Sequence, residues 1–256
     1  MHESVETMPT NKSQVAGSTQ LKRPKVIAAI PCYDEEKFIS EVVRRANEYV
    51  DQVIVIDDGS HDNTSQAAKA AGALVINHSV NKGYGESIRS CFEAAKANDA
   101  DVLVILDGDE QHDPDEVPRA LAPILDGKAD LVIGSRFLSG QSSVPRYRKF
   151  GIGVITWLFN VGAKVKVSDA QSGFRTYNRR ILDTLSLTER GMGISVEVLI
   201  KARGKGFTIR EVPISCRYHS TSSTMNPVRH GLGVALTVVK LRSKSWLRML
   251  IRGNNA

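Results

Sequence analysis

Short runs of apolar, mostly β-branched residues alternate along the chain with segments in which apolar residues recur at helical spacing. This alternation is typical of βαβ units, which place consecutive strands in one largely parallel sheet. We therefore expect strands at residues 25–30, 52–56, 73–77, 102–106 and 130–134, with helices at 35–50, 63–71, 85–98 and 114–125 between them. Beyond residue 138 the pattern loosens and predicts a Ser-rich basic loop, an uncharged helix at 150–163, a helix near 196–201 and a strand at 208–213. The expected fold class is α/β, a mostly parallel sheet flanked by helices.

Three predicted loops follow strands at the same edge of this sheet, at residues 31–35, 57–60 and 107–111. In open α/β sheets, ligands bind at the carboxyl ends of the strands. Asp107 and Asp109 stand two positions apart after a buried strand, where an acidic cluster is unfavourable unless a cation lies beside it. Together with Gln111 they offer oxygen ligands suited to Mg²⁺ or Mn²⁺. The alternative interpretation is that Asp107 caps a turn and Asp109 is solvated.

A second pair of acids, Asp57 and Asp58, ends the second predicted strand. A carboxylate there can accept hydrogen bonds from a base edge or a ribose hydroxyl. The alternative is an Asp-Gly-Ser turn in which Ser60 or Asp62 caps the next helix.

Seven motifs in a fixed order connect these loops to a known family. They are IPCYDEE, VIVIDDGSHDNT, NKGYGESIRSCFEAA, VLVILDGDEQHDPDEVP, LVIGSRFL, DAQSGFRTYNR and IREVPI, and they cover nearly all of residues 25–214. The chain resembles the family 2 glycosyltransferases of the GT-A fold, and among them the dolichyl-phosphate (polyprenyl-phosphate) sugar synthases. The resemblance implies inverting, metal-dependent transfer of a hexosyl group from a nucleotide-sugar to polyprenyl phosphate, which makes a lipid-linked sugar donor. The alternative is a sugar or protein hydroxyl acceptor.

The resemblance also implies roles for individual residues. It assigns donor binding to Pro31, Tyr33, Glu35, Asp57, Asp58, Lys82, Gly85 and Asp107. It assigns a divalent ion, Mg²⁺ or Mn²⁺, to Asp107, Asp109 and Gln111. The expected catalytic residues are Asp109, Arg136 and Arg148, the two arginines facing phosphate groups. For Arg148, in the PRYRK segment, the alternative is a loop of solvated cations.

Three further residues are candidates for the site or for a structural role. Arg175 and Glu197 are additional site candidates, or else members of buried ion pairs. A structural role is expected for His112, because the Asp-Pro that follows it is typical of a helix start.

The expected donor is GDP-mannose, UDP-glucose or a UDP-N-acetylhexosamine. After EVPI, mannosyl synthases of this kind usually carry Arg-x-x-Gly-x-Ser-Lys, whereas this chain has Ser220 and Ser223 at the Gly and Lys positions. A dehydrogenase or P-loop protein is not expected. No G-x-G-x-x-G follows the first strand, and no G-x-x-x-x-G-K-[ST] occurs in the sequence.

The charge of +6 is unevenly distributed, because residues 201–256 hold eleven Lys and Arg against one acid and so carry +10. Lys240, Lys244, Arg248 and Arg252 would form a stripe on a helix, beside an arc of Trp246, Leu247, Leu250 and Ile251. We therefore predict attachment to a membrane surface, on its cytoplasmic face. Alternatively, the apolar arc docks on the catalytic domain or on a membrane-embedded partner. No nucleic-acid partner is expected, since Trp246 is the only aromatic residue after Tyr218.

Three segments are expected along the chain. Residues 1–23 are polar without an apolar run and are expected to be a disordered leader, followed by the glycosyltransferase domain at 24–225 and the basic tail at 226–256. The longest uncharged run, 150–163, has 14 residues, too few to span a bilayer. Three widely spaced cysteines without a CxxC pair indicate a reducing compartment.

Overall fold

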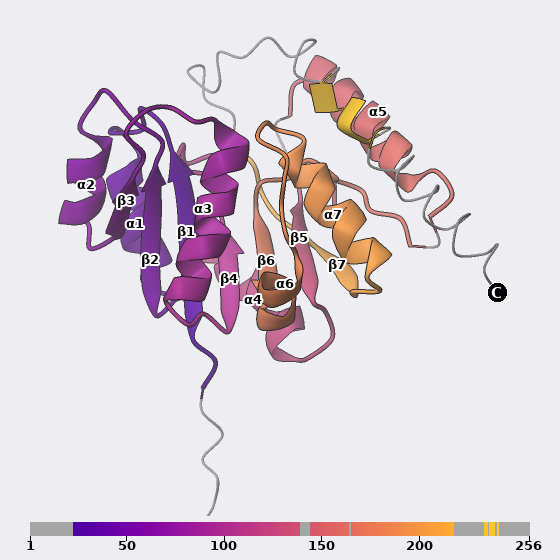
Figure 1. The fold of residues 1–256 in the computed structure, drawn as a ribbon, viewed down its shortest axis with the longest axis horizontal. Helices are drawn as coiled ribbons and strands as arrows, with labels where there is room; N and C mark the ends of the chain where they lie inside the picture. The colour runs from indigo at the N-terminus through magenta and orange to yellow at the C-terminus, as the bar shows by residue number, and fades with distance from the viewer. Residues whose placement is uncertain are drawn as a thin grey trace, which may run out of the picture.

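The computed structural model describes residues 23–138, 144–163, 165–217, 233–234, 236–238 and 240. Its centre is a seven-stranded sheet in the order β3-β2-β1-β4-β6-β5-β7 (Figure 1). The strands are β1 Val26–Cys32, β2 Gln52–Asp57, β3 Leu74–Asn77, β4 Val102–Ile105, β5 Leu131–Ser135, β6 Arg175–Asn178 and β7 Ile209–Pro213. All pairs are parallel except those of β6, which runs antiparallel to both β4 and β5. The α/β class predicted from the sequence is confirmed.

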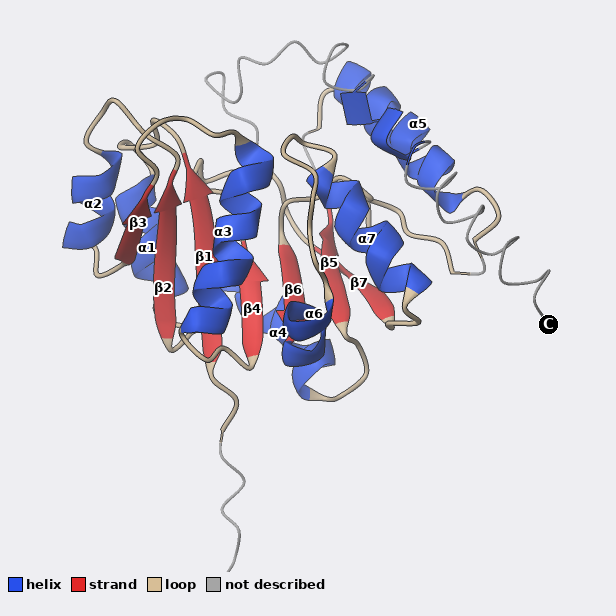
Figure 2. Cartoon of the chain, in the orientation of Figure 1, coloured by secondary structure: helices blue, strands red, loops and turns tan. Residues whose placement is uncertain are grey.

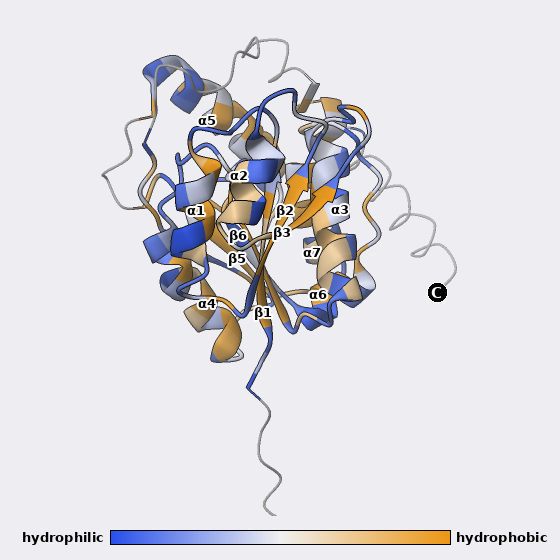
Figure 3. Ribbon diagram, turned by 90° about the vertical axis from the view of Figure 1, so that its left-hand side faces the viewer, coloured by the Kyte–Doolittle hydropathy of each residue, from blue (hydrophilic) through white to orange (hydrophobic). Residues whose placement is uncertain are grey.

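Helices cover both faces of this sheet (Figures 2 and 3). One layer holds α1 Ile39–Ala46, α2 Thr64–Ala70 and α4 Val117–Leu125, with the short 3₁₀ helix η1 Pro114–Glu116 before α4. The other layer holds α3 Tyr84–Ala97, α6 Arg179–Thr184 and α7 Ile194–Gly204. A longer helix, α5 Arg146–Asn160, lies on the side toward which the parallel strands point (Figure 1).

Two hydrophobic cores fill the space between the sheet and the two helix layers. In β2, Ile54 and Ile56 belong to one core and Val53 and Val55 to the other, because successive side chains of a strand point to opposite faces. This explains why β2 is apolar at every interior position, as expected for a parallel strand covered on both sides.

The structure confirms the strands and helices predicted between residues 25 and 134, with shifted ends. The largest shift is in α1, which begins at Ile39 rather than 35, since residues 36–38 form a turn, and ends at Ala46. The strand β6 and the helix α6 were not predicted. The prediction that the PRYRK segment is a loop was wrong, because α5 already begins at Arg146 and includes Arg148.

Several predictions lie at or beyond the limits of the described residues. Residues 1–22 and 241–256 are outside them, and so are most of the predicted leader and tail. Within the tail, Val234 and Val238 are buried in the same core as α7. No helix among the described residues is both long and apolar enough to cross a membrane.

Candidate functional site

The loop after β4 carries Asp107, which the structure holds against a second loop. A Cβ atom added to Gly173, just before β6, would lie 2.5 Å from Asp107 Oδ2, so only glycine allows this approach. The Asp107 backbone N–H donates to His112 Nδ1 at 3.4 Å. Burial lowers the pKa of His112 to about 4, so the ring is neutral and acts as an acceptor. This placement agrees with a structural role for His112.

Three carboxylates at this edge of the sheet share an environment that disfavours their charge. Burial, followed by the charges of Asp109 and Asp107, raises the pKa of Glu35 to about 7. Burial likewise raises the pKa of Asp107 to about 6, although the charges of Arg136 and Arg175 oppose the shift. The pKa of Asp109 is also raised, by burial and by Asp107. The loops after β1 and β4 therefore concentrate negative charge at one place.

The donor set of this acidic cluster fits a hard divalent cation, which prefers carboxylate oxygens and usually keeps waters or phosphate oxygens as further ligands. In the described part of the chain, no three His, Cys, Asp or Glu side chains converge as a complete metal site. The Gln111 side-chain amide donates to Asp109 Oδ2, and the Gln111 backbone N–H donates to Asp109 Oδ1 at 3.1 Å. Gln111 is thus positioned as a hydrogen-bond donor to Asp109, and its assignment as a metal ligand stays a prediction.

Asp58 is buried and organises the loop before α3. Its two carboxylate oxygens accept the backbone N–H groups of Lys82 at 2.9 Å and Gly83 at 2.8 Å, and Oδ1 also contacts His78 Nδ1 at 2.6 Å. Lys82 itself is exposed. The predicted donor-binding residues Asp58 and Lys82 are therefore brought together, with the acid fixing the backbone of the loop that carries the lysine.

Asp57 and its neighbours form the turn that was the alternative interpretation. Asp57 accepts the backbone N–H of Ser60 at 2.9 Å, and Asp62 accepts that of Thr64 at 2.9 Å. Gly59 has φ +77° and lies so close to Val80 that a Cβ would be 2.7 Å from its carbonyl carbon. The turn thus also determines how the loop after β3 packs.

The loops after β1 and β2 are joined side by side. The Tyr33 hydroxyl lies 3.2 Å from His61 Nδ1, and the two rings meet edge to face. The His61 backbone N–H donates to Asp34 Oδ1 at 2.7 Å. Tyr33 is 40% exposed, whereas Pro31 is buried inside β1. Of these predicted donor-binding residues, Tyr33 presents its ring to solvent and Pro31 does not.

Gly85 is a packing residue in the first turn of α3. A Cβ at this position would lie 2.3 Å from the carbonyl carbon of Arg190, which belongs to the loop before α7. This backbone contact ties the start of α3 to that loop. Gly85 was predicted to bind the donor, and its closest contact is with the protein's own backbone.

Arg136 follows β5 and forms a buried ion pair. Its Nε and Nη2 atoms donate to the two carboxylate oxygens of Asp169 at 2.7 and 2.8 Å. The Asp169 side chain is completely buried. Burial raises the pKa of Asp169, but the charge and hydrogen bonds of Arg136 outweigh that effect and lower it. Arg136, predicted to face phosphate, is thus anchored by an acid that sequence reasoning did not single out.

The family model described as Glycosyl transferase family 2 matches residues 27–186. The chain belongs to glycosyl transferase family 2. A dolichyl-phosphate hexose transferase from Haloferax volcanii is 31% identical over 219 residues, which are 85% of this chain and 93% of that protein. A UDP-N-acetylglucosamine–dolichyl-phosphate N-acetylglucosaminyltransferase from Methanococcus voltae is 32% identical, over 74% of this chain and 84% of its own length.

The fold of this family 2 glycosyltransferase matches solved structures. A glucosyl-3-phosphoglycerate synthase from Mycobacterium tuberculosis, in complex with Mn²⁺, UDP and glucosyl-3-phosphoglycerate, superposes with a TM-score of 0.69 at 23% identity. The match covers 85% of this chain and 80% of the synthase. The likeness shows the fold, and it confirms the predicted GT-A architecture.

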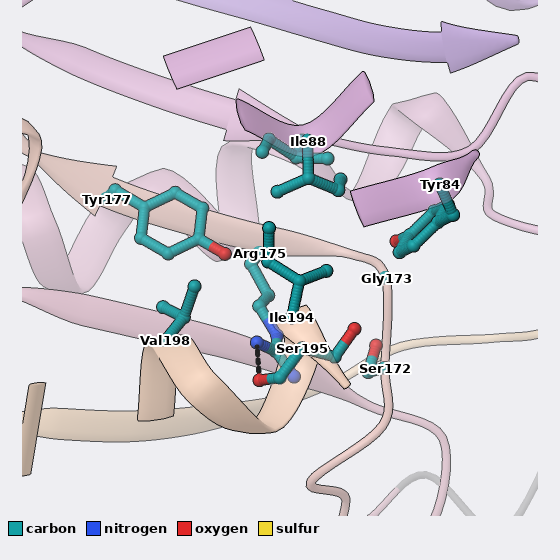
Figure 4. Close-up of a pocket in the computed structure, with 10 residues that line it drawn as sticks. Tyr84, Ile88, Ser172, Gly173, Arg175, Tyr177, Ile194, Ser195 and Val198 are labelled. Carbon is teal, nitrogen blue, oxygen red and sulfur yellow. Dashed lines mark hydrogen bonds between the residues drawn. The ribbon is translucent and has the colours of Figure 1, made fainter. Parts of the chain in front are cut away.

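Beside Asp107, the glycosyltransferase has a small pocket between α3, α7, β4 and β6 (Figure 4). The buried guanidinium of Arg175 donates to the carbonyl oxygens of Ser195 at 2.5 Å and Ala170 at 2.8 Å. Arg175 Nε and Ser172 Oγ have no hydrogen-bond partner in the described part of the chain. Arg175 therefore braces two backbone segments, and its charge acts on Asp107.

Glu197, the other additional candidate, is a member of a buried ion pair. It contacts Lys201 Nζ at 2.6 Å and accepts the backbone N–H of Thr188 at 3.0 Å. Glu197 thus fixes the same loop whose Arg190 lies against Gly85. Asp169 had a sequence signal too, because it begins the DAQSGFR motif, but its partner Arg136 lies 33 positions earlier.

Proposed function

We propose that this glycosyltransferase moves a hexosyl group from a nucleotide-sugar to dolichyl or polyprenyl phosphate, with inversion and with a divalent metal ion. The observation that carries the proposal is the acidic cluster of Glu35, Asp107 and Asp109, hard oxygen donors at the carboxyl ends of β1 and β4 whose pKa values are raised, chiefly by burial. The named activities of the archaeal relatives support the lipid-phosphate acceptor.

In this mechanism Asp107 and Asp109 would hold the metal, with Gln111 as a further oxygen ligand. When bound, Mg²⁺ or Mn²⁺ would supply positive charge to the diphosphate that leaves with the nucleoside. The Mn²⁺ and UDP of the structural neighbour support this choice. The described residues contribute the anionic cluster, and Glu35 adds a third carboxylate whose charge a cation would favour.

The acceptor chemistry agrees with the structural role of the histidine in the acidic loop. A phosphate acceptor is anionic at neutral pH and needs no strong general base, whereas a sugar hydroxyl does. His112, the histidine in this loop, is buried and bonded to the backbone. The charge of the phosphate would be balanced by Arg148, which is half-buried in the first turn of α5, and by Arg136.

The decisive experiment offers purified protein a panel of GDP-mannose, UDP-glucose and UDP-N-acetylhexosamines, with polyprenyl phosphate and Mg²⁺ or Mn²⁺. We expect one donor to give a lipid-linked product, and the relative named for UDP-N-acetylglucosamine makes that donor the first to test. Transfer only to sugar or protein hydroxyls would contradict the proposed acceptor, and an unchanged rate in EDTA would contradict the metal.

The same assay tests the acidic cluster. Asp109→Ala should lower turnover roughly a hundredfold or more, since a metal ion contributes several kcal/mol of charge stabilisation. The melting temperature should stay unchanged or rise, because the variant removes a carboxylate that burial and Asp107 already disfavour. Asp126→Ala is the control, since Asp126 is an exposed carboxylate that pairs with Lys128. Wild-type turnover in Asp109→Ala would exclude Asp109 as a ligand.

A further inference from the structure

The helix α5 has two apolar faces on opposite sides. Its inner face holds Ile152, Ile155 and Phe159, which are at most 8% exposed. Its outer stripe consists of Phe150, Val154 and Trp157, together with Val161 directly after the end of the helix, and these residues are 77%, 42%, 65% and 45% exposed. At about 100° per residue, the two sets are centred on opposite sides of the helix. Burial against the protein accounts for only one of them.

The outer stripe is too apolar for a face turned to water. A tryptophan and a phenylalanine exposed together on one helix mark an interaction surface rather than scattered surface residues. Phe150, Val154 and Trp157 line one hollow with Gly153, where no atom lies within 4 Å of an added Cβ. A span is excluded, since α5 has 15 residues and a bilayer requires about 20.

The charges around the outer stripe are positive and indicate which kind of partner it binds. Arg146 and Lys149 are exposed in the first turn of α5, and Lys166 is exposed beyond the end of the helix. α5 contains no acidic residue, and its hydrophilic start is followed by the apolar segment (Figure 3). A second copy of the chain would place these cations against identical cations. An anionic lipid surface instead accepts cations and apolar side chains together.

We propose that α5 lies in the surface of an anionic bilayer, with Phe150, Val154, Trp157 and Val161 inserted among the lipids. This deepens the proposed function and rests on it for the identity of the acceptor. By helical geometry Arg148 lies near the inner face of α5, between the outer stripe and the body of the enzyme. A lipid-linked phosphate leaving the bilayer would therefore meet Arg148 on its way to the carboxyl ends of the parallel strands, which point toward the side on which α5 lies (Figure 1).

Trp157 reports insertion directly. The sequence has two tryptophans, so Trp246→Phe in the full chain leaves Trp157 as the fluorophore. With phosphatidylcholine vesicles that contain phosphatidylglycerol, we expect a blue shift of the emission and quenching by brominated acyl chains. Unchanged Trp157 emission while the protein pellets with the vesicles would overturn the proposal. A blue shift without vesicles that grows with protein concentration would do the same, in favour of a second copy.

A matched pair of variants tests the energetics. Phe150→Gln with Trp157→Gln should weaken vesicle binding by roughly a hundredfold or more, because both substitutions remove an aromatic side chain from the lipid. The control is Leu74→Gln with Leu125→Gln, which alters two residues that are 43% and 51% exposed outside α5. Equal loss of binding in both pairs would contradict a specific role of the outer stripe.

Assays with two acceptors distinguish the membrane docking of α5 from the proposed transfer activity. With a water-soluble, short-chain isoprenyl phosphate, the α5 variant should keep the wild-type rate. With polyprenyl phosphate in vesicles, its rate should fall by the same factor as its vesicle binding. Equal losses with both acceptors would contradict docking and indicate damage to the site. If neither acceptor supports transfer by the wild type, the proposed function fails, whereas Trp157 quenching still decides the docking.

Discussion

Glu35 makes the stability of the metal-free enzyme depend on pH. Its pKa is raised from 4.5 to about 7, so the folded state holds a proton that the unfolded chain releases. The contribution that Glu35 makes to the stability of the fold is therefore fully present below pH 4.5 and is lost as the pH rises through 7. We expect the melting temperature without metal to fall between pH 5 and 8, and Mn²⁺ to raise it more at pH 8.

Glu35→Gln is the control for this pH dependence, because glutamine does not titrate. Its melting temperature should change less over the same range in differential scanning fluorimetry. An identical pH profile in the variant and the wild type would show that Glu35 does not carry the effect.

Two variants separate the structural role of Arg136, which forms an ion pair with Asp169, from its predicted role at the phosphate. Arg136→Ala leaves a fully buried carboxylate uncompensated, which should destabilise the fold by about 3–5 kcal/mol. In Arg136→Ala with Asp169→Asn, much of that stability should return because no buried charge remains. If Arg136 also stabilises phosphate charge, turnover should stay low while nucleotide affinity changes less. Restored turnover in the double variant would make Arg136 a structural residue only.

The chemistry of single residues was easier to predict from the sequence than their partners. Acids at strand ends follow from the order of motifs, and Asp58 and Asp107 lie where the pattern placed them. Their hydrogen bonds depend on how distant loops return. Asp58 binds the backbone at residues 82 and 83, and Asp107 lies against Gly173. No local pattern encodes those contacts.

At the scale of elements, the contact between α3 and the loop before α7 gives a test with two glycines. Gly85→Ala would place its Cβ 2.3 Å from the Arg190 backbone, and we expect about 1–3 kcal/mol of destabilisation and weaker nucleotide binding. Gly151→Ala in α5 has no atom within 4 Å and should be neutral or stabilise by up to about 1 kcal/mol. Chemical denaturation measures both. Equal effects would contradict the packing role of Gly85.

The sequence pattern missed β6 because its residues are polar although the strand is buried. The strand β6 reads Arg-Thr-Tyr-Asn, yet its first three residues are buried between β4 and β5. The four residues show no alternation of apolar and polar positions, and the strand pairs with β4 and β5, which lie far away in the sequence. In α5, the first turn resembled a loop in the sequence because it is rich in charged residues such as Arg146 and Lys149, which the structure shows to be exposed. The apolar remainder was predicted as a helix.

At the scale of the whole molecule, the uneven charge predicts salt-dependent membrane binding. Residues 241–256 carry four Lys and Arg and lie outside the described residues. Lys240 stays in the truncated chain, because it lies 3.6 Å from Glu189. Deleting 241–256 should leave nucleotide binding unchanged and weaken binding to anionic vesicles at low salt by roughly a thousandfold, since each of the four cations contributes about 1 kcal/mol.

The control for this deletion is Lys244→Gln, Arg248→Gln and Arg252→Gln in the full chain, which separates charge from length. It should reproduce most of the loss. If the truncated protein pelleted with the vesicles as completely as the wild type, the tail would not be the electrostatic anchor.

The position of β6 also determines the order in which the enzyme is completed during synthesis. The strands β1 to β4 and their helices are contiguous in the chain and can pair as soon as they leave the ribosome. The free edge of β4 is then covered only when β6 arrives, after α5 has been made, with Ile105 opposite Arg175. Until then β4 is an unpaired apolar edge, open to association with other nascent chains. The same late strand brings Gly173 to Asp107, so the acidic loop after β4 reaches its final surroundings only at this last step of folding.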